Sequence, residues 1–303
     1  MNNQARIIAV SGGLYSVADS NGDVIQCRAR GVFRHNNQRP LVGDRVELTV
    51  EPAGKDSTAT VIGGILERKN ALIRPPMANL DYLFVTAASS SPAPDTLMLD
   101  KLTAIAEFNR IKPVMVLSKC ELDRASSVRL AEIYRLAGYR TFTVSCYTGE
   151  GLESLAEYIK ALPADSISAF AGASGVGKSS LMNKLFPDLQ LATSEVSRQT
   201  QRGRHTTRGV TLYPTGGGYI ADTPGFSMLD FEHFDFFTKD DLPGTFPEFS
   251  ELLGTCRYTK CTHTKEDGCA ILEAVRDGRI AATRHESYLE LYRVLKDKHP
   301  WDK

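Results

Sequence analysis

The chain has 303 residues, of which 42% are hydrophobic and 24% are charged, and its 36 Lys and Arg residues balance 36 Asp and Glu residues. This composition is typical of globular proteins, and the length predicts roughly two domains. The zero net charge excludes a uniformly basic surface, so a nucleic-acid interface must be a local patch. No apolar run approaches the roughly 18 residues of a membrane span, and MNNQARIIAV lacks the apolar stretch of a signal peptide. We therefore expect a cytoplasmic protein with no membrane partner.

Residues 1–67 contain five short segments rich in β-branched residues and separated by turns: ARIIAV, LYSVAD, DVIQCRAR, DRVELTV and ATVIGGI. Five short strands in one small region predict a barrel, of which the OB-fold is a common form. The stretch 28–45 holds one acid, Phe33, His35 and five arginines, namely Arg28, Arg30, Arg34, Arg39 and Arg45. Arginines beside stackable rings favour contact with RNA or single strands, and the alternative is an ordinary solvated loop.

From about residue 71 strand-like and helical segments alternate along the chain. The strand-like segments are LDYLFVTAA, KPVMVLS, RTFTVS, SISAFAG, GVTLYP and GGYIAD. Helical spacing of apolar residues occurs at 96–109, at 126–137 and in LESLAEYIKAL. The alternation predicts an α/β region in which a parallel sheet has helices on both faces. Residues 226–250 are acidic and aromatic and predict a loop that packs its rings onto a core, with further helices at 270–277 and 281–297.

One segment matches the phosphate-loop pattern G-x-x-x-x-G-K-[ST] at every position, between a predicted strand and a predicted helix. Its glycines allow backbone N–H groups to surround phosphates. Lys178 is expected to reach the β- and γ-phosphates, and Ser179 is expected to bind Mg²⁺. The nucleotide-binding residues predicted here are Gly172, Ala173, Ser174, Gly175, Val176, Gly177, Lys178, Ser179 and Ser180.

Two segments after this loop are candidates for sensing the γ-phosphate. Asp222-Thr223-Pro224-Gly225 follows a predicted strand, where the aspartate suits Mg²⁺ through water and Gly225 can donate its N–H to the γ-phosphate. This D-x-x-G pattern is common in turns, but it becomes specific downstream of a phosphate loop. Between the two lies the segment 203–207, in which Thr206 is predicted to bind Mg²⁺ only when the γ-phosphate is present. Thr207 is the alternative ligand.

The predicted strand PVMVL is followed by Ser118-Lys119-Cys120-Glu121, at the place where GTPases carry N-K-x-D. In that motif the lysine stem lies on the guanine ring, and the carboxylate accepts hydrogen bonds from the base. Glu121 keeps the carboxylate on a longer stem, whereas Ser118 lacks the amide. We expect these four residues to bind the base and the segment 145–147, Ser-Cys-Tyr, to form the second guanine loop; ordinary loops are the alternative in both cases.

Three of the six cysteines lie within the segment 256–269, and one histidine lies among them. Cys256, Cys261, His263 and Cys269 offer three thiolates and one imidazole, which predicts one structural zinc with no open position for catalysis. In a reducing compartment such clustering indicates a metal rather than disulfides. The other three cysteines, Cys27, Cys120 and Cys146, are scattered and are expected to be buried small hydrophobic residues.

The order of the motifs is circularly permuted: the base segment comes first, followed by the phosphate loop, the switch segment and D-T-P-G. With G-A-S-G-V-G-K-S-S, G-R-H-T-T, D-T-P-G-F, F-P-E-F and C-x₄-C-x-H-x₅-C, the chain resembles the RsgA (YjeQ) family of circularly permuted small-ribosomal-subunit biogenesis GTPases over almost its whole length. The resemblance implies a multidomain α/β architecture. We expect an OB-fold RNA-binding domain at 1–67, a permuted GTPase domain at 68–228, and a zinc-binding helical domain at 229–303.

The resemblance also implies that the protein binds the small ribosomal subunit and its rRNA, hydrolyses GTP with Mg²⁺ on stimulation by that subunit, and is then released. We expect a monomer. Phe226 stands where many GTPases have a glutamine that orients water, which predicts slow intrinsic hydrolysis. The resemblance makes His205 the catalytic candidate, and an RNA or phosphate contact is its alternative role. Two other functions stay open: an RNA-binding adaptor that only senses GTP or GDP, and an ATPase suggested by Ser118 and Glu121.

Overall fold

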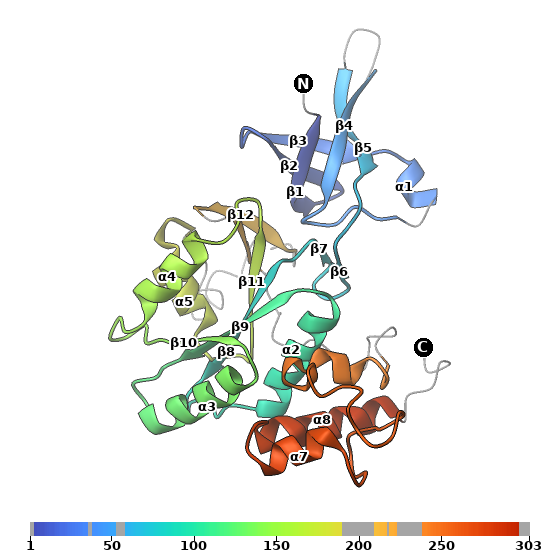
Figure 1. Ribbon diagram of the computed structural model, residues 1–303. Coiled ribbons are helices and arrows are strands. Elements are labelled where there is room, and N and C mark those ends of the chain that lie inside the picture. Colours follow the sequence, from blue (N-terminus) through green and yellow to red (C-terminus); the bar gives the residue numbers. More distant parts are fainter. Residues whose placement is uncertain are drawn as a thin grey trace. The chain divides into compact units, whose positions relative to one another are not determined.

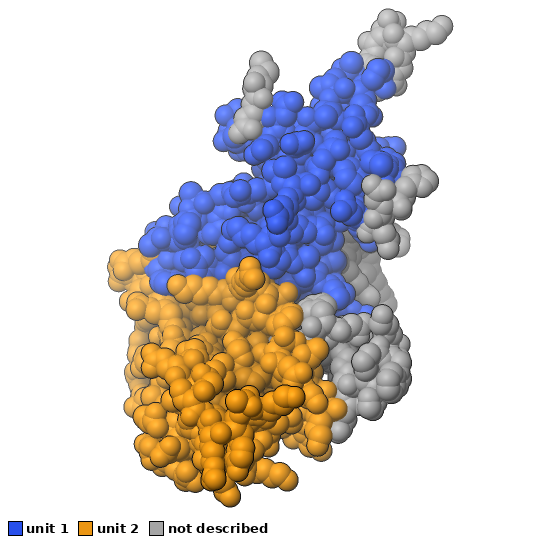
Figure 2. All heavy atoms as spheres, turned by 45° about the vertical axis from the view of Figure 1, so that its right-hand side comes forward, with its two compact units in different colours: residues 1–82, 158–170, 192–226 blue, residues 83–157, 171–191, 227–303 orange. Residues whose placement is uncertain are grey.

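The computed structural model describes residues 3–35, 38–52, 58–189, 209–216, 218–222 and 238–296 (Figure 1). The chain forms two compact units, which Figure 2 colours separately. The first unit comprises residues 1–82, 158–170 and 192–226. The second comprises residues 83–157, 171–191 and 227–303.

The first unit begins with a closed five-stranded barrel. Its elements are β1 (Gln4–Ser11), β2 (Leu14–Asp19), β3 (Val24–Ala29), the short helix α1 (Val32–His35), β4 (Arg45–Pro52) and β5 (Thr58–Ile65). The strand order is β1-β2-β3-β5-β4, and β4 pairs back with β1 to close the barrel. The β1–β2 turn is Gly12-Gly13 with positive φ at both residues, a conformation that favours glycine in tight hairpins. Ile7, Val17, Val46 and Ile62 are fully buried, and the predicted OB-like barrel is confirmed.

The same unit contains the short hairpin β6 (Ala71–Leu72) and β7 (Met77–Ala78), followed later in the chain by β11 (Ile167–Ala171), β12 (Thr211–Thr215) and β13 (Gly218–Asp222). β13 is parallel to β11, as the alternating pattern predicts. β12, in contrast, is antiparallel to β13 and also to β1 of the barrel. The turn between β12 and β13 is too short for the crossover that a parallel pair needs, so the sheet is mixed rather than all parallel.

The second unit contains β8 (Tyr82–Ala88), α2 (Thr96–Phe108), β9 (Lys112–Ser118), α3 (Arg124–Leu136), β10 (Arg140–Thr143), α4 (Leu152–Lys160) and α5 (Lys178–Leu185). The strand order is β10-β9-β8, and β10 is parallel to β9. The carboxylates of Asp95 and Asp123 accept hydrogen bonds from the backbone N–H groups of Met98 and Ser126, which caps α2 and α3. These helices begin and end within two residues of the predicted 96–109 and 126–137.

The C-terminal part of this unit has two 3₁₀ turns, Leu242–Thr245 and Pro247–Phe249, and the helices α7 (Ala270–Arg276) and α8 (Ala282–Lys296). The rings of Phe246 and Phe249, both buried, lie 5.4 and 5.1 Å from the ring of Tyr288 on α8. The predicted packing of aromatic residues is thus confirmed for the described part of the loop. Residues 226–237 of that loop lie outside the described ranges.

Arg284 on α8 ties this C-terminal part to α2 and α3. Its side chain is 1% exposed, and it donates to Asp100 Oδ1 at 2.6 Å and to Glu248 Oε1 at 2.7 Å. The Tyr134 hydroxyl on α3 also donates to Asp100 Oδ1, at 2.9 Å. The guanidinium lies over the ring of Phe246, 4.5 Å from its centroid. Since truncating Arg284 would leave two buried carboxylates without their cation, this cluster holds the C-terminal part firmly in place.

Candidate functional site: a nucleotide loop and a metal centre

The phosphate loop connects β11 to α5, so the predicted strand before it and helix after it are both confirmed. Gly172 has φ 145°, and a Cβ atom there would lie 2.1 Å from the carbonyl oxygen of Thr86. Gly175 and Gly177 also have positive φ, 80° and 94°. The loop therefore needs glycine for both its backbone conformation and its close approach to β8.

Lys178 lies inside the curve of this loop. Its Nζ donates to the carbonyl oxygens of Gly172 and Ala173, at 2.7 Å each. Burial lowers the pKa of the Lys178 ammonium from its usual value. The loop thus holds a partly buried cation at the position where a lysine binds phosphate oxygens.

The base segment contacts the phosphate loop directly. The hydroxyl of Ser118, which is 2% exposed, lies 2.5 Å from the carbonyl oxygen of Val176 and 3.1 Å from that of Ala87. Lys119 has φ 55°, and its Nζ donates to the carbonyl oxygens of Gly175 at 2.8 Å and Ser91 at 2.6 Å. The fold therefore brings together two motifs that are more than fifty residues apart in sequence.

The remaining residues of the base segment lie beside the segment that was predicted to form the second guanine loop. The N–H of Cys120 donates to the carbonyl oxygen of Val144 at 3.3 Å, and the Cys120 thiol is fully buried. Glu121 is exposed. Burial raises the pKa of Cys146, with a further increase from Glu121 that Lys184 on α5 opposes. Residues 118–121 and 145–147 thus form neighbouring loops, with the Glu121 carboxylate open to solvent.

Asp222 is the last residue of β13, in register with Thr211 on β12. Burial raises the pKa of its carboxyl group, and both burial and Asp222 raise the pKa of Tyr213. Asp222 is in the first unit, where β13 places it at the predicted strand end. The other predicted members of this group, His205, Thr206, Thr207, Gly225 and Phe226, lie outside the described residues.

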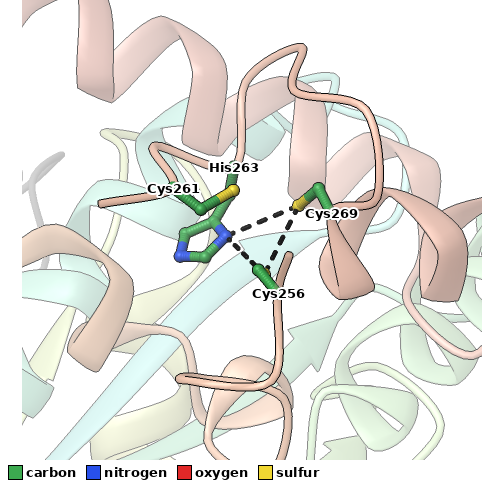
Figure 3. Close-up of side chains that lie close together, drawn as sticks. All are labelled: Cys256, Cys261, His263 and Cys269. Carbon is green, nitrogen blue, oxygen red and sulfur yellow. Dashed lines mark hydrogen bonds between the residues drawn. The ribbon is translucent and has the colours of Figure 1, made fainter. Parts of the chain in front are cut away.

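The four predicted metal ligands converge on one point (Figure 3). All their ligand atoms lie within 4.8 Å of one another. Nδ1 of His263 lies 3.6 Å from Cys256 Sγ and 3.5 Å from Cys269 Sγ, and these two sulfurs are 3.9 Å apart. A tetrahedral zinc bonded at about 2.3 Å to sulfur and about 2.1 Å to nitrogen requires ligand separations of about 3.5–3.8 Å. The donor set, and the spacing of Cys256, His263 and Cys269 within it, therefore fit zinc.

A glutamate that the sequence pattern did not single out organises the loop that carries His263. The Glu266 carboxylate accepts hydrogen bonds from the N–H groups of Thr262 at 2.8 Å, Thr264 at 3.0 Å and Lys265 at 3.0 Å. Burial raises its pKa, but hydrogen bonds from the Thr262 hydroxyl and from backbone N–H groups, among them those of Thr262 and Lys265, outweigh burial and lower the pKa to about 2. The carboxylate thus fixes the turn between two metal ligands.

Helix α8 also holds this loop. His285 Nε2 donates to the carbonyl oxygen of His263, and the Tyr288 hydroxyl donates to that of Thr262, both at 2.8 Å. His263 itself has φ 59°, an unusual conformation for a residue with a side chain. Sequence reasoning missed His285 and Tyr288 because they follow the cluster on a separate helix, with no metal-ligand spacing to mark them.

The predicted basic stretch of the barrel is partly neutralised. Arg30 pairs with Glu51 at 2.5 Å, and Arg45 pairs with Asp165. A cavity of about 410 Å³ lies on the barrel, lined by Gly13, Tyr15, Ala29, Arg30, Phe33, Arg39 and Pro40. Two guanidinium groups and two rings therefore line this cavity, the combination that was expected for an RNA surface. Cys27 and Cys120 are buried as predicted, and Cys146 is half-buried.

The sequence model of the family described as RsgA GTPase matches residues 65–232, and that of the RsgA N-terminal domain matches residues 4–57. The chain belongs to the RsgA family of GTPases. A relative named small ribosomal subunit biogenesis GTPase RsgA, from Caldanaerobacter subterraneus subsp. tengcongensis, is 44% identical over 97% of this chain and 96% of its own. The relative of the same name from Bacillus subtilis is 39% identical over 98% of this chain and 99% of its own.

Solved structures of RsgA relatives have the same fold. YjeQ from Thermotoga maritima superposes with a TM-score of 0.80 at 33% identity and covers 98% of this chain and 99% of its own. YloQ, described as a circularly permuted GTPase, superposes with a TM-score of 0.77 at 36% identity. The match covers 98% of this chain and 96% of the YloQ chain. The predicted family, the permuted GTPase fold and GTPase activity are thereby confirmed. Among the described helices, none is long and apolar enough to span a membrane.

Proposed function

We propose that this GTPase acts in the maturation of the small ribosomal subunit, as the names of its relatives state for those proteins. It works as a cytoplasmic monomer with three parts. Residues 1–67 bind rRNA, residues 68–228 hydrolyse GTP, and residues 229–303 bind zinc. The observation that carries the nucleotide assignment is the contact of Ser118 and Lys119 with the phosphate-loop backbone. This contact supports a single nucleotide site in which the phosphate loop binds the phosphates and the base segment binds the base.

Each predicted nucleotide contact then has a role. The backbone N–H groups of 172–180 surround the phosphates, and Lys178 exchanges its two carbonyl partners for phosphate oxygens. The Lys119 stem packs on the base, and Glu121 accepts from guanine N–H groups. Bound Mg²⁺ would neutralise charge developing on the phosphates, and Ser179 and Thr206 would hold it, with Asp222 acting through water. Gly225 donates its N–H to the γ-phosphate.

His205 is the residue we assign to positioning the attacking water, because Phe226 cannot form a hydrogen bond to it. In phosphoryl transfer, positioning and charge stabilisation are the main sources of rate. His205→Ala should leave nucleotide affinity and the slow basal turnover nearly unchanged. It should abolish most of the stimulation by small ribosomal subunits while binding to them persists.

The experiment measures GTP turnover of both proteins with and without purified small subunits, together with subunit binding by sedimentation. His299→Ala, which removes a histidine outside every motif, is the matched control and should be stimulated like the parent protein. Full stimulation of His205→Ala would transfer the catalytic role to the ribosome. A parent protein that neither binds nor responds to small subunits would refute the proposed function itself.

A further inference from the structure

A row of paired residues connects the barrel to the proposed Mg²⁺ site. Ala9 on β1 is in register with Thr211 on β12, and Thr211 is in register with Asp222 on β13. Paired residues of adjacent antiparallel strands lie about 4.5–5.5 Å apart. Asp222 is therefore only two strands away from a strand of the barrel, and both belong to the same compact unit.

The side chain of Arg6 provides a second connection between the barrel and the strands β11 and β13, beside the row Ala9–Thr211–Asp222. It is on β1, is 5% exposed, and donates from Nε at 3.0 Å and Nη2 at 2.6 Å to Asp165 Oδ1. Its Nη1 donates to the carbonyl oxygen of Gly43 at 3.1 Å, and its guanidinium lies 5.5 Å from the ring centroid of Tyr219. Arg45 of β4 pairs with the other oxygen of Asp165. Two arginines of the barrel thus converge on one carboxylate outside it.

The partners of Arg6 stand at the beginnings of two parallel strands. Asp165 precedes β11, and Tyr219 is near the start of β13, where it is in register with Ile167. Parallel strands that begin at one edge of a sheet end at the opposite edge. At those ends β11 continues into the phosphate loop, and β13 finishes at Asp222. Arg6 therefore holds the starts of both strands whose ends carry nucleotide motifs.

We propose that Arg6, with Asp165, is a positioning residue for the Mg²⁺–nucleotide complex, through which a partner bound to the barrel shifts the ends of β11 and β13. The proposal rests on the proposed function in one respect, that the barrel is where the small subunit binds. Arg6 is 5% exposed whereas Asp165 is 44% exposed, so breaking their two hydrogen bonds would leave a buried guanidinium without its counterion, and the pair transmits displacement for that reason. Linkage makes the effect reciprocal: subunit binding and nucleotide binding must change each other by the same factor.

The test measures the affinity of a non-hydrolysable GTP analogue with Mg²⁺, in the presence and absence of purified small subunits. The ratio of the two affinities should be about fivefold or more in the parent protein. Arg6→Gln and the isosteric Asp165→Asn should each bring the ratio close to one. The variant that combines Arg6→Gln with Asp165→Asn should have the same affinity ratio as each single variant, because both changes break the same ion pair.

Lys69→Gln is the matched control. It removes the 2.7 Å ion pair between Lys69 and Asp81, which involves no residue of β1 or β13. Asp81 also accepts a hydrogen bond from the N–H of Ile167 on β11 at 2.9 Å, so this control tests whether the loss of any ion pair near the start of β11 is enough. The affinity ratio should keep its parent value in this variant. An equal loss in Lys69→Gln would mean that general loosening of the unit, rather than the Arg6 pair, explains the result, and would overturn the proposal.

A second measurement needs no ribosome and so separates this proposal from the proposed function. Amide hydrogen exchange of β1 should slow when Mg²⁺ and the GTP analogue bind to the free parent protein, and this response should disappear in Arg6→Gln and Asp165→Asn. If the parent protein fails to bind small subunits, the proposed function is wrong. In that case the hydrogen-exchange response by itself tests the role of Arg6 and Asp165. An unchanged affinity ratio in both variants, or an exchange response that survives in them, overturns the inference.

Discussion

The metal centre and the phosphate loop hold their key polar groups in opposite ways. Around the metal centre, Cys256, Cys269 and His263 direct their ligand atoms toward one another at 3.5–3.9 Å. In the phosphate loop, Lys178 is already bound by the carbonyl oxygens of Gly172 and Ala173. The first arrangement is assembled for an ion, whereas the second satisfies its own hydrogen bonds.

This difference predicts different roles for the two ligands. The unfolded chain holds no preformed metal site, so the free energy of zinc binding is also free energy that folds the segment. Nucleotide binding instead exchanges existing hydrogen bonds for bonds to phosphate, and the net gain per hydrogen bond is small. The metal should therefore be required for local structure, and the nucleotide for function only.

Loss of zinc should have the largest effect. Cys261→Ala, or removal of the metal by a chelator, is expected to unfold the region around 256–269, because zinc contributes about 10–16 kcal/mol in small zinc-finger peptides. Nucleotide binding should survive, and binding to small subunits should fall. Proteolysis and circular dichroism report the unfolding, with Cys27→Ala as the control for loss of a cysteine elsewhere. Carefully purified protein without stoichiometric zinc would contradict the assignment.

Loss of the phosphate-loop lysine should come next. Lys178→Ala removes a charge-assisted contact worth about 1.5–3 kcal/mol, so affinity for GTP and GDP should fall together by about 10- to 100-fold. The thermal stability of the free protein should change much less, in contrast to the zinc variant. Calorimetric titration measures the two nucleotide affinities, and thermal unfolding measures the stability of the free protein. A loss confined to GTP would show that Lys178 contacts only the γ-phosphate.

Changes in the base segment, residues 118–121, should have a smaller effect, and this effect should be an increase in GTP affinity. The hydroxyl of Ser118 has one proton but faces two carbonyl oxygens, those of Val176 and Ala87. An amide could donate to both, so Ser118→Asn combined with Glu121→Asp should raise GTP affinity, at about 0.5–1.5 kcal/mol per hydrogen bond.

Titrations of the base variant with GTP and ATP measure both affinity and guanine selectivity. Ser118→Ala is the companion variant and should weaken binding of both nucleotides equally, because this hydroxyl faces the phosphate loop rather than the base. If the double variant binds GTP no better than the parent, this segment is either already optimal or not the base site.

The last expected effect is on the pH dependence of stability rather than on binding, and it concerns the buried cluster that anchors the zinc-bearing part. Burial raises the pKa of Glu107 to about 7, with Arg284 opposing the shift and Glu248 adding to it. The folded state thus keeps a proton that the unfolded state loses near pH 4.5, so stability falls as pH rises from about 4.5 through 7. Glu107→Gln should remove this decline, by about 1–3 kcal/mol at pH 8. Urea unfolding at pH 5 and pH 8 measures it, with the exposed Glu132→Gln as control, and an unchanged slope would exclude Glu107.

The candidate site residues were recognisable in the sequence because their signals are local. A glycine-rich loop before Lys178 and four ligands inside 256–269 follow from spacing alone, since a tight loop or a small metal site is built from neighbours in sequence. The barrel strands and the helices α2 and α3 were predictable for the same reason, because they depend on periodicity and turn residues. The antiparallel direction of β12 was missed because its short hairpin resembles any pair of strands in an alternating pattern.

By itself, then, the sequence determined the motifs, their permuted order and the ligand set of the metal centre. Only the tertiary structure decided which distant residues meet. Ser118 reaches Val176 across 58 positions, and Arg284 reaches Asp100 across 184. Such contacts depend on how whole strands and helices pack, and no local propensity encodes that packing. For the same reason Arg6, an unremarkable residue of one barrel strand in the sequence, became a link to the strands that carry the nucleotide motifs.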